Sequence, residues 1–114
     1  MPRRSWRFWA EDILQALETI HDYTRDMDRD GFIRDRRTVD AVLRNLIVIG
    51  EASRKVPAEV QQANPQIPWQ EMSDMRNVVV HEYFGVSVPI IWDTVARDLP
   101  PLIPAFRRLL DEPE

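Results

Sequence analysis

The sequence has no cysteine and only three glycines among its 114 residues. Without cysteine, the chain can form neither disulfides nor thiolate metal sites. So few glycines suit helices and leave little for hairpins or a phosphate-cradling loop. No apolar run approaches the roughly 20 residues needed to span a bilayer, and no signal-peptide pattern follows Arg3 and Arg4. We therefore expect one globular domain, residues 1–114, in the cytoplasm, with no membrane contact.

Lysine is nearly absent as well, since the basic residues are fourteen arginines and Lys55. Acidic residues outnumber them, and the net charge of −4 weighs against a protein that coats nucleic acid. The arginines of residues 3–7 and 34–37 form two local clusters, each either a solvated face or an RNA contact. Any RNA contact is expected to be confined to a groove.

The hydrophobic spacing predicts an all-α fold. Apolar residues recur at three- and four-residue intervals over residues 5–28, 35–55 and 68–83, which predicts three main helices. Ser5 is the expected cap of the first helix, and Asp30-Gly31 is expected to interrupt the helical structure after it.

Prolines set the remaining boundaries. Pro57 ends the second helix, and residues 57–63 are expected to form one or two turns of their own. A fourth helix should begin near Ser87, and Pro100-Pro101 should interrupt it. Residues 102–111 are then a kinked continuation or a fifth helix. The prediction is an antiparallel bundle of four to five helices.

The third predicted helix is apolar on several sides, because Trp69, Met72, Met75 and three consecutive valines crowd it. Such a helix favours burial on more than one face. We expect a homodimer that forms through the side of this helix. The alternative is a monomer in which proline-rich loops cover the same surface.

One stretch of that helix, residues 76–83, reads Arg-Asn-Val-Val-Val-His-Glu-Tyr. Arg76 can hold a phosphate through paired, charge-assisted hydrogen bonds. The imidazole of His81 is the type of group that takes and returns a proton near neutral pH. Together they suit a metal-free attack on an RNA phosphodiester. Alternatively, both are donors at a helix end, where His81 interacts with the helix dipole.

Arg76 and His81 are not direct neighbours on an ideal helix. Five residues separate them by about 140° around the axis and about 7.5 Å along it. Convergence on one phosphate requires the reach of arginine, a distorted helix end or a second protomer. This geometry favours a composite site in a dimer over a pair within one chain.

Four blocks of the sequence resemble one family. The pattern R-x-x-x-x-H-x-Y at residues 76–83, with residues 43–57, 67–72 and 91–102 in the same order, is similar to the HepT-like toxins. These toxins are a branch of the HEPN ribonuclease superfamily. The resemblance covers roughly residues 37–110, and the N-terminal helix agrees in character only.

The resemblance implies a HEPN-like helical dimer and a metal-independent endoribonuclease toxin, with Arg76 and His81 as catalytic residues and no cofactor. The implied substrate is messenger or transfer RNA, cut by 2′-hydroxyl attack. The implied partner is an antitoxin, a minimal nucleotidyltransferase of the MNT type, which neutralises the toxin by adding AMP to Tyr83. The alternative is a non-catalytic, nucleotide-binding or interaction module that partners the same transferase.

Two further side chains are expected to support Arg76. Asn77 donates hydrogen bonds to a phosphate or orients Arg76, or else it satisfies a loop carbonyl. Glu51, beside Gly50, is placed to pair with Arg76, either to hold it for function or as a purely structural salt bridge. Gly50 is expected to allow a close approach of two helices.

The tyrosines and the second histidine complete the candidates. Tyr83 is the implied AMP site, with a structural tyrosine as the alternative. Tyr23, on the apolar stripe of the first helix, is expected to be buried. His21 lies in a charged stretch and is expected at the surface. With two histidines and no cysteine, we expect no metal site.

Overall fold

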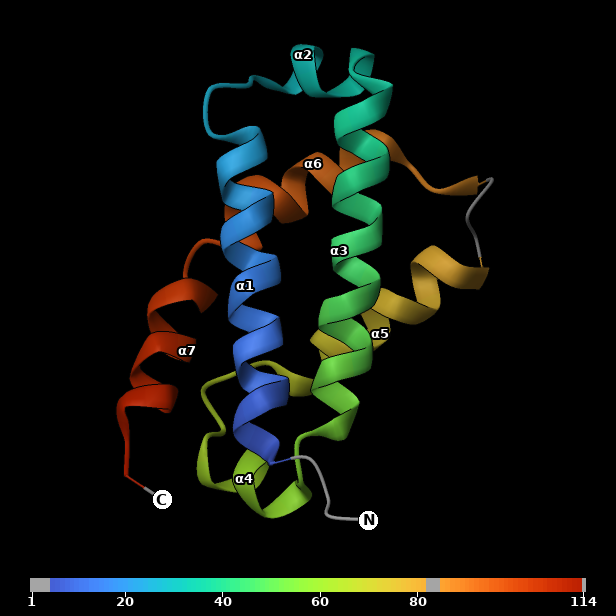
Figure 1. Cartoon of the computed structure of the whole chain (residues 1–114). Coiled ribbons are helices and arrows are strands. Elements are labelled where there is room, and N and C mark those ends of the chain that lie inside the picture. The colour runs from blue at the N-terminus through green and yellow to red at the C-terminus, as the bar shows by residue number, and fades with distance from the viewer. Residues whose placement is uncertain (1–4, 82–84, 114) are drawn as a thin grey trace.

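The structure is a computed structural model that describes residues 5–81 and 85–113. Every regular element within these residues is a helix, so the predicted all-α fold is confirmed (Figure 1). The elements in chain order are α1 (Trp6–Thr24), α2 (Arg29–Arg34), α3 (Arg36–Lys55), α4 (Ala58–Ala63), α5 (Trp69–His81), α6 (Val88–Asp93), the π-helical η2 (Thr94–Asp98) and α7 (Leu102–Asp111).

Helix α3 is the centre of the bundle. It runs antiparallel to α1, while α5 crosses behind it and α7 lies beside α1 (Figure 1). The most extensive helix contacts are those of α3 with α5 and with α1. Buried apolar side chains from these helices form one core cluster that includes Ile13, Leu46, Met72 and Phe106. The position of α5 is therefore set mainly by α3.

The first helix is shorter than predicted. Ser5 caps α1 as expected, because its hydroxyl oxygen accepts a hydrogen bond from the backbone N–H of Arg7 at 3.2 Å. The helix ends at Thr24, however, and the Asp28 carboxylate accepts from the N–H of Gly31 at 2.7 Å. This bond caps α2. The expected break at Asp30-Gly31 is wrong, since both residues lie inside α2.

The later boundaries agree closely with expectation. Asp35 caps α3, and the hydrogen bond from the backbone N–H of Thr38 is the main reason that the pKa of Asp35 lies below its usual value. Residues 58–63 form the short α4. The fourth helix begins at Val88, and the tail after Pro100-Pro101 is a separate helix, α7. The π-helical η2 was not predicted.

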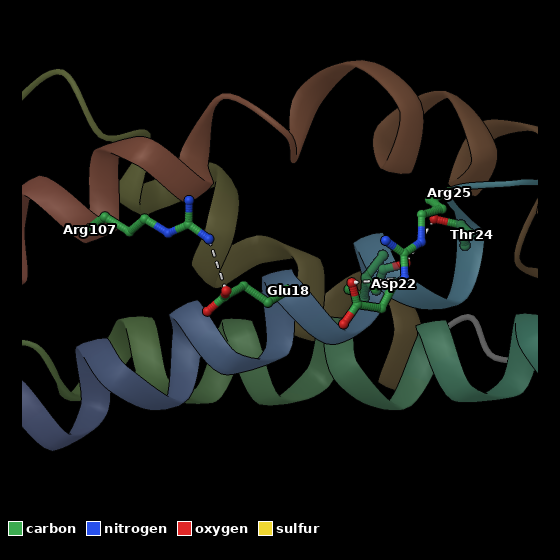
Figure 2. A network of polar contacts seen from close by, with 6 residues as sticks. Glu18, Asp22, Thr24, Arg25 and Arg107 are labelled. Atoms are coloured by element: carbon green, nitrogen blue, oxygen red, sulfur yellow. Dashed lines mark hydrogen bonds and ion pairs between the residues drawn. The ribbon is translucent and has the colours of Figure 1, made fainter.

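Polar contacts fasten α7 along α1. Figure 2 shows Arg107 of α7 reaching Glu18 of α1, with 3.0 Å between Nη2 and Oε2. Near the N-terminus of α1, Nη1 of Arg7 donates to the carbonyl oxygen of Leu110 at 2.8 Å. An exposed ion pair contributes at most about 1 kcal/mol. Burial of Phe106 and Leu109 therefore contributes more to the attachment of α7.

The predicted burial of Tyr23 is wrong, because 53% of its surface is exposed. On α1 the inward positions are taken by Leu17, Ile20 and Thr24, so Tyr23 falls beside the buried stripe. Thr24 can be buried because its hydroxyl donates to the carbonyl oxygen of Ile20 at 2.7 Å. The phenol of Tyr23 lies instead at a polar groove between α1 and α3, which Arg44 also lines.

Helices α3 and α5 lie close together at Gly50, where the sequence predicted a close approach of two helices. A Cβ atom at Gly50 would lie 2.8 Å from the backbone nitrogen of Arg76 and 3.1 Å from its Cα. Real Cβ atoms do not approach backbone this closely. The missing side chain of Gly50 therefore lets the backbone of Arg76 rest against α3.

We predict that Gly50→Ala destabilises the protein although alanine is the better helix former. The gain in helix propensity is about 1 kcal/mol, whereas overpacking costs about 1–3 kcal/mol and here involves backbone that cannot rotate away. The free energy of unfolding in urea should fall. Gly85→Ala is the matched control, because a Cβ there meets nothing within 4 Å. A Gly50→Ala protein as stable as the Gly85→Ala protein would contradict the close approach.

Candidate active site

The site is built around an ion pair between α5 and α3. Nε of Arg76 lies 2.5 Å from Oε1 of Glu51, and the two side chains are 30% and 46% exposed. The pair expected from the sequence is therefore present. It fixes the direction of the Arg76 side chain and neutralises its charge.

Asn77 joins this pair to a second arginine. Its side-chain oxygen accepts from Nη2 of Arg54 at 2.6 Å and from Nη1 of Arg76 at 3.4 Å. Nε of Arg54 also donates to the hydroxyl of Ser73 at 2.9 Å. Among the described residues, the side-chain oxygen of Asn77 thus contacts both arginines. We call Glu51, Arg54, Ser73, Arg76 and Asn77 the arginine cluster.

Arg54 and Ser73 were missed by the sequence reasoning. Arg54 stands three residues after Glu51 on α3, and Ser73 stands four residues before Asn77 on α5. Residues at these spacings share a helix face. Once Glu51 and Asn77 were candidates, this spacing was the signal that could have found both.

His81 is the last residue of α5, and its side chain is exposed. Within the described part of the chain, no hydrogen bond or ion pair joins it to the arginine cluster. The helix continues without a break from Trp69 to His81, so the ideal-helix separation from Arg76 applies. Convergence on one phosphate must therefore come from the reach of Arg76 or from a second copy.

The remaining sequence candidates fall outside this cluster. Tyr83 lies outside the described residues. His21 is exposed on α1, as expected. Over residues 5–81 and 85–113, no three histidine, aspartate or glutamate side chains gather closely enough to hold a metal ion. No helix in the same ranges is long and apolar enough to cross a bilayer.

Apolar side chains of the motif helix remain open to solvent beside the site. The inward residues of α5 are Trp69, Met72 and Val79, whereas Val80 is exposed. Val78 is 49% exposed, and Ile90 of α6 is 64% exposed. Val78 and Ile90 border a hollow of about 330 Å³ between α3, α5 and α6. One copy of the chain thus leaves the apolar surface around α5 partly uncovered.

Comparison with known proteins identifies related chains over almost the whole length. The model of the ribonuclease HepT-like family matches residues 13–109. A protein of Thermococcus cleftensis named "Probable ribonuclease HepT" is 42% identical over 107 residues, which cover 94% of this chain and 97% of that protein.

Two more distant relatives agree. A Methanocaldococcus jannaschii protein named as a "Putative RNase" is 38% identical over 114 residues, covering 100% of this chain and 94% of that protein. A Caldanaerobacter subterraneus protein, also named as a "Putative RNase", is 33% identical over 106 residues, covering 93% of this chain and 95% of that protein. No solved structure matches the chain significantly.

Proposed function

Because the chain belongs to the HepT-like ribonuclease family, we propose that residues 1–114 act as one HEPN-like endoribonuclease domain that cuts RNA without a metal ion. One observation carries the proposal. Arg76 forms an ion pair with Glu51 at 2.5 Å, and it lies on the same helix as the exposed imidazole of His81. A fixed cation and an accessible base are the two groups that 2′-hydroxyl attack requires.

In the proposed reaction, His81 takes the proton of the 2′-hydroxyl, and this oxygen attacks the adjacent phosphorus. The bond from phosphorus to the 5′-oxygen breaks, which leaves a 2′,3′-cyclic phosphate and a 5′-hydroxyl. A second imidazole, from the other copy of a dimer, would protonate the leaving oxygen. Arg76 would stabilise the negative charge that develops on the phosphate oxygens.

We further propose that the chain works as a homodimer and as the toxin of a toxin–antitoxin pair in the cytoplasm. The dimer is supported by the uncovered apolar side chains of α5 and α6 and by the distance of Arg76 from His81 along one helix. The proposed antitoxin is a nucleotidyltransferase of the MNT type. The proposed substrate is messenger or transfer RNA.

The transferase is proposed to act on Tyr83, two residues after His81 in the sequence. An AMP group there would add bulk and negative charge near the motif and so compete with the substrate phosphate. The exposure of Tyr23 leaves its phenol accessible too, so burial does not exclude Tyr23 as the modified residue. The argument rests on its place in the motif.

The first prediction concerns catalysis. His81→Ala and Arg76→Ala should each reduce cleavage of RNA by a factor of about 10² or more, because proton transfer and charge stabilisation each contribute that much. His21→Ala, the same change at an exposed histidine on α1, should cleave like the unmodified protein. Cleavage should also continue in EDTA.

Full activity in a folded His81→Ala protein would refute the catalytic assignment. A protein that binds RNA and never cleaves it would favour the non-catalytic interaction module. Activity lost in EDTA and restored by magnesium would contradict the histidine–arginine mechanism.

The second prediction concerns assembly. Light scattering should give twice the monomer mass of 13.5 kDa. The double change Val78→Glu and Ile90→Glu should give the monomer mass, because it buries two carboxylates in the proposed interface. Tyr23→Glu, at an exposed aromatic residue on α1, should remain dimeric. A monomeric unmodified protein, or a dimer that survives the double change, would show that this surface is not the interface.

The third prediction concerns control by the partner. After co-expression with the transferase, mass spectrometry should find AMP on the peptide that contains Tyr83. Tyr83→Phe should escape neutralisation, whereas Tyr23→Phe should remain neutralised. An adduct on Tyr23, or a neutralised Tyr83→Phe protein that carries no AMP, would contradict this model.

A further inference from the structure

We propose that Arg54 binds a backbone phosphate of the RNA and supplies the net positive charge that the motif arginine lacks. The ligand class, a single-stranded RNA phosphodiester, rests on the proposed function. The residue itself is assigned by the contacts of the arginine cluster.

The two arginines of the cluster differ in whether a carboxylate neutralises their charge. Arg76 faces the Glu51 carboxylate at 2.5 Å, so this pair together carries no net charge. The Arg54 side chain donates hydrogen bonds to the neutral hydroxyl of Ser73 and the neutral amide of Asn77. Among the described residues, no carboxylate lies within salt-bridge distance of Arg54. The net charge of +1 at the cluster is therefore the charge of Arg54.

The two hydrogen bonds also hold Arg54 in a defined position. A guanidinium has five N–H donors, and these contacts use one on Nε and one on Nη2. The other donors remain for an anion, and the residue is exposed. A long side chain fixed before binding loses less conformational entropy when the ligand arrives. The hydrogen bonds to Ser73 and Asn77 thus hold the Arg54 side chain in place before a phosphate binds.

Arg54 and Arg76 are close enough to act on one ligand. Both guanidinium groups donate to the same oxygen, the Oδ1 atom of Asn77, at 2.6 and 3.4 Å. A phosphodiester that reaches Arg76 therefore also lies near Arg54. A negatively charged phosphate would balance the +1 charge of the cluster without displacing Glu51.

A purely structural role is the competing explanation. Arg54 belongs to α3, and both of its partners belong to α5, so it also ties the two helices together. Exposed hydrogen bonds of this kind contribute little to stability, because water competes for the same groups. A structural tie would change stability, whereas a phosphate contact changes the dependence of RNA binding on salt.

The test measures binding of a fully 2′-O-methylated, single-stranded RNA, which the proposed reaction cannot cleave, over a series of KCl concentrations. Arg54→Gln should weaken binding about tenfold at low salt and reduce the slope of log K against log salt by about 0.7, the value for one lost contact on a single strand. Arg54→Lys should keep the slope, because it keeps the charge. Arg44→Gln is the matched control, since it makes the same change on α3 at the groove beside Tyr23.

Asn77→Asp is the second variant, and it keeps the test decisive if Arg54→Gln does not fold. It places a carboxylate between the two guanidiniums, which strengthens both hydrogen bonds and removes the net charge. Its thermal stability should be equal or higher, while its RNA affinity falls.

The proposal is overturned if Arg54→Gln and Asn77→Asp bind the probe with the affinity and slope of Arg44→Gln. It is equally overturned if the unmodified protein does not bind the probe. Cleavage of unmodified RNA is measured in parallel and tests the proposed function separately. Binding that depends on Arg54 in a protein without cleavage would support this inference and reject the nuclease.

Discussion

The contact at Gly50 is the constraint on which the candidate site depends. The backbone of Arg76 can rest on α3 only because Gly50 has no side chain there. Glu51 follows Gly50 directly, and Arg54 lies one turn further along the same helix. One close approach therefore places a carboxylate and a guanidinium of α3 near the motif arginine. A shift of α5 away from α3 would separate all of these contacts together.

The sequence predicted the helices well because their signals are local. Apolar spacing, the cap at Ser5 and the proline boundaries each act within a few residues. The error at Tyr23 arose because this position lies between two faces of its helix. Tyr23 is beside the buried stripe of α1, and the orientation of α1 in the bundle decides which way its side chain points. The short α2 was missed because Asp28 is a cap that also reads as the end of the preceding helix.

The sequence predicted the part of the site whose residues lie close together along the chain. Arg76, Asn77 and His81 stand together in one motif, so the sequence displays them. The Glu51–Arg76 pair could be anticipated because Gly50 marks a close approach. For Arg54 the signal is weaker, since it is one arginine among fourteen and only its spacing from Glu51 on α3 marks it. That spacing places Arg54 on the same helix face as Glu51, but its contacts with Ser73 and Asn77 are tertiary and appear only in the structure.

The arginine cluster and His81 differ in how they are supported. Two helices and a set of hydrogen bonds hold the cations, whereas the imidazole stands exposed at the last residue of α5. In the proposed mechanism, binding of the RNA and its cleavage therefore depend on different residues. A copy of the chain that lacks only the His81 imidazole would, in that mechanism, still bind RNA and shield the strand from intact copies. By loss of one exposed side chain, the same fold would turn from a nuclease into a competitor that protects the substrate.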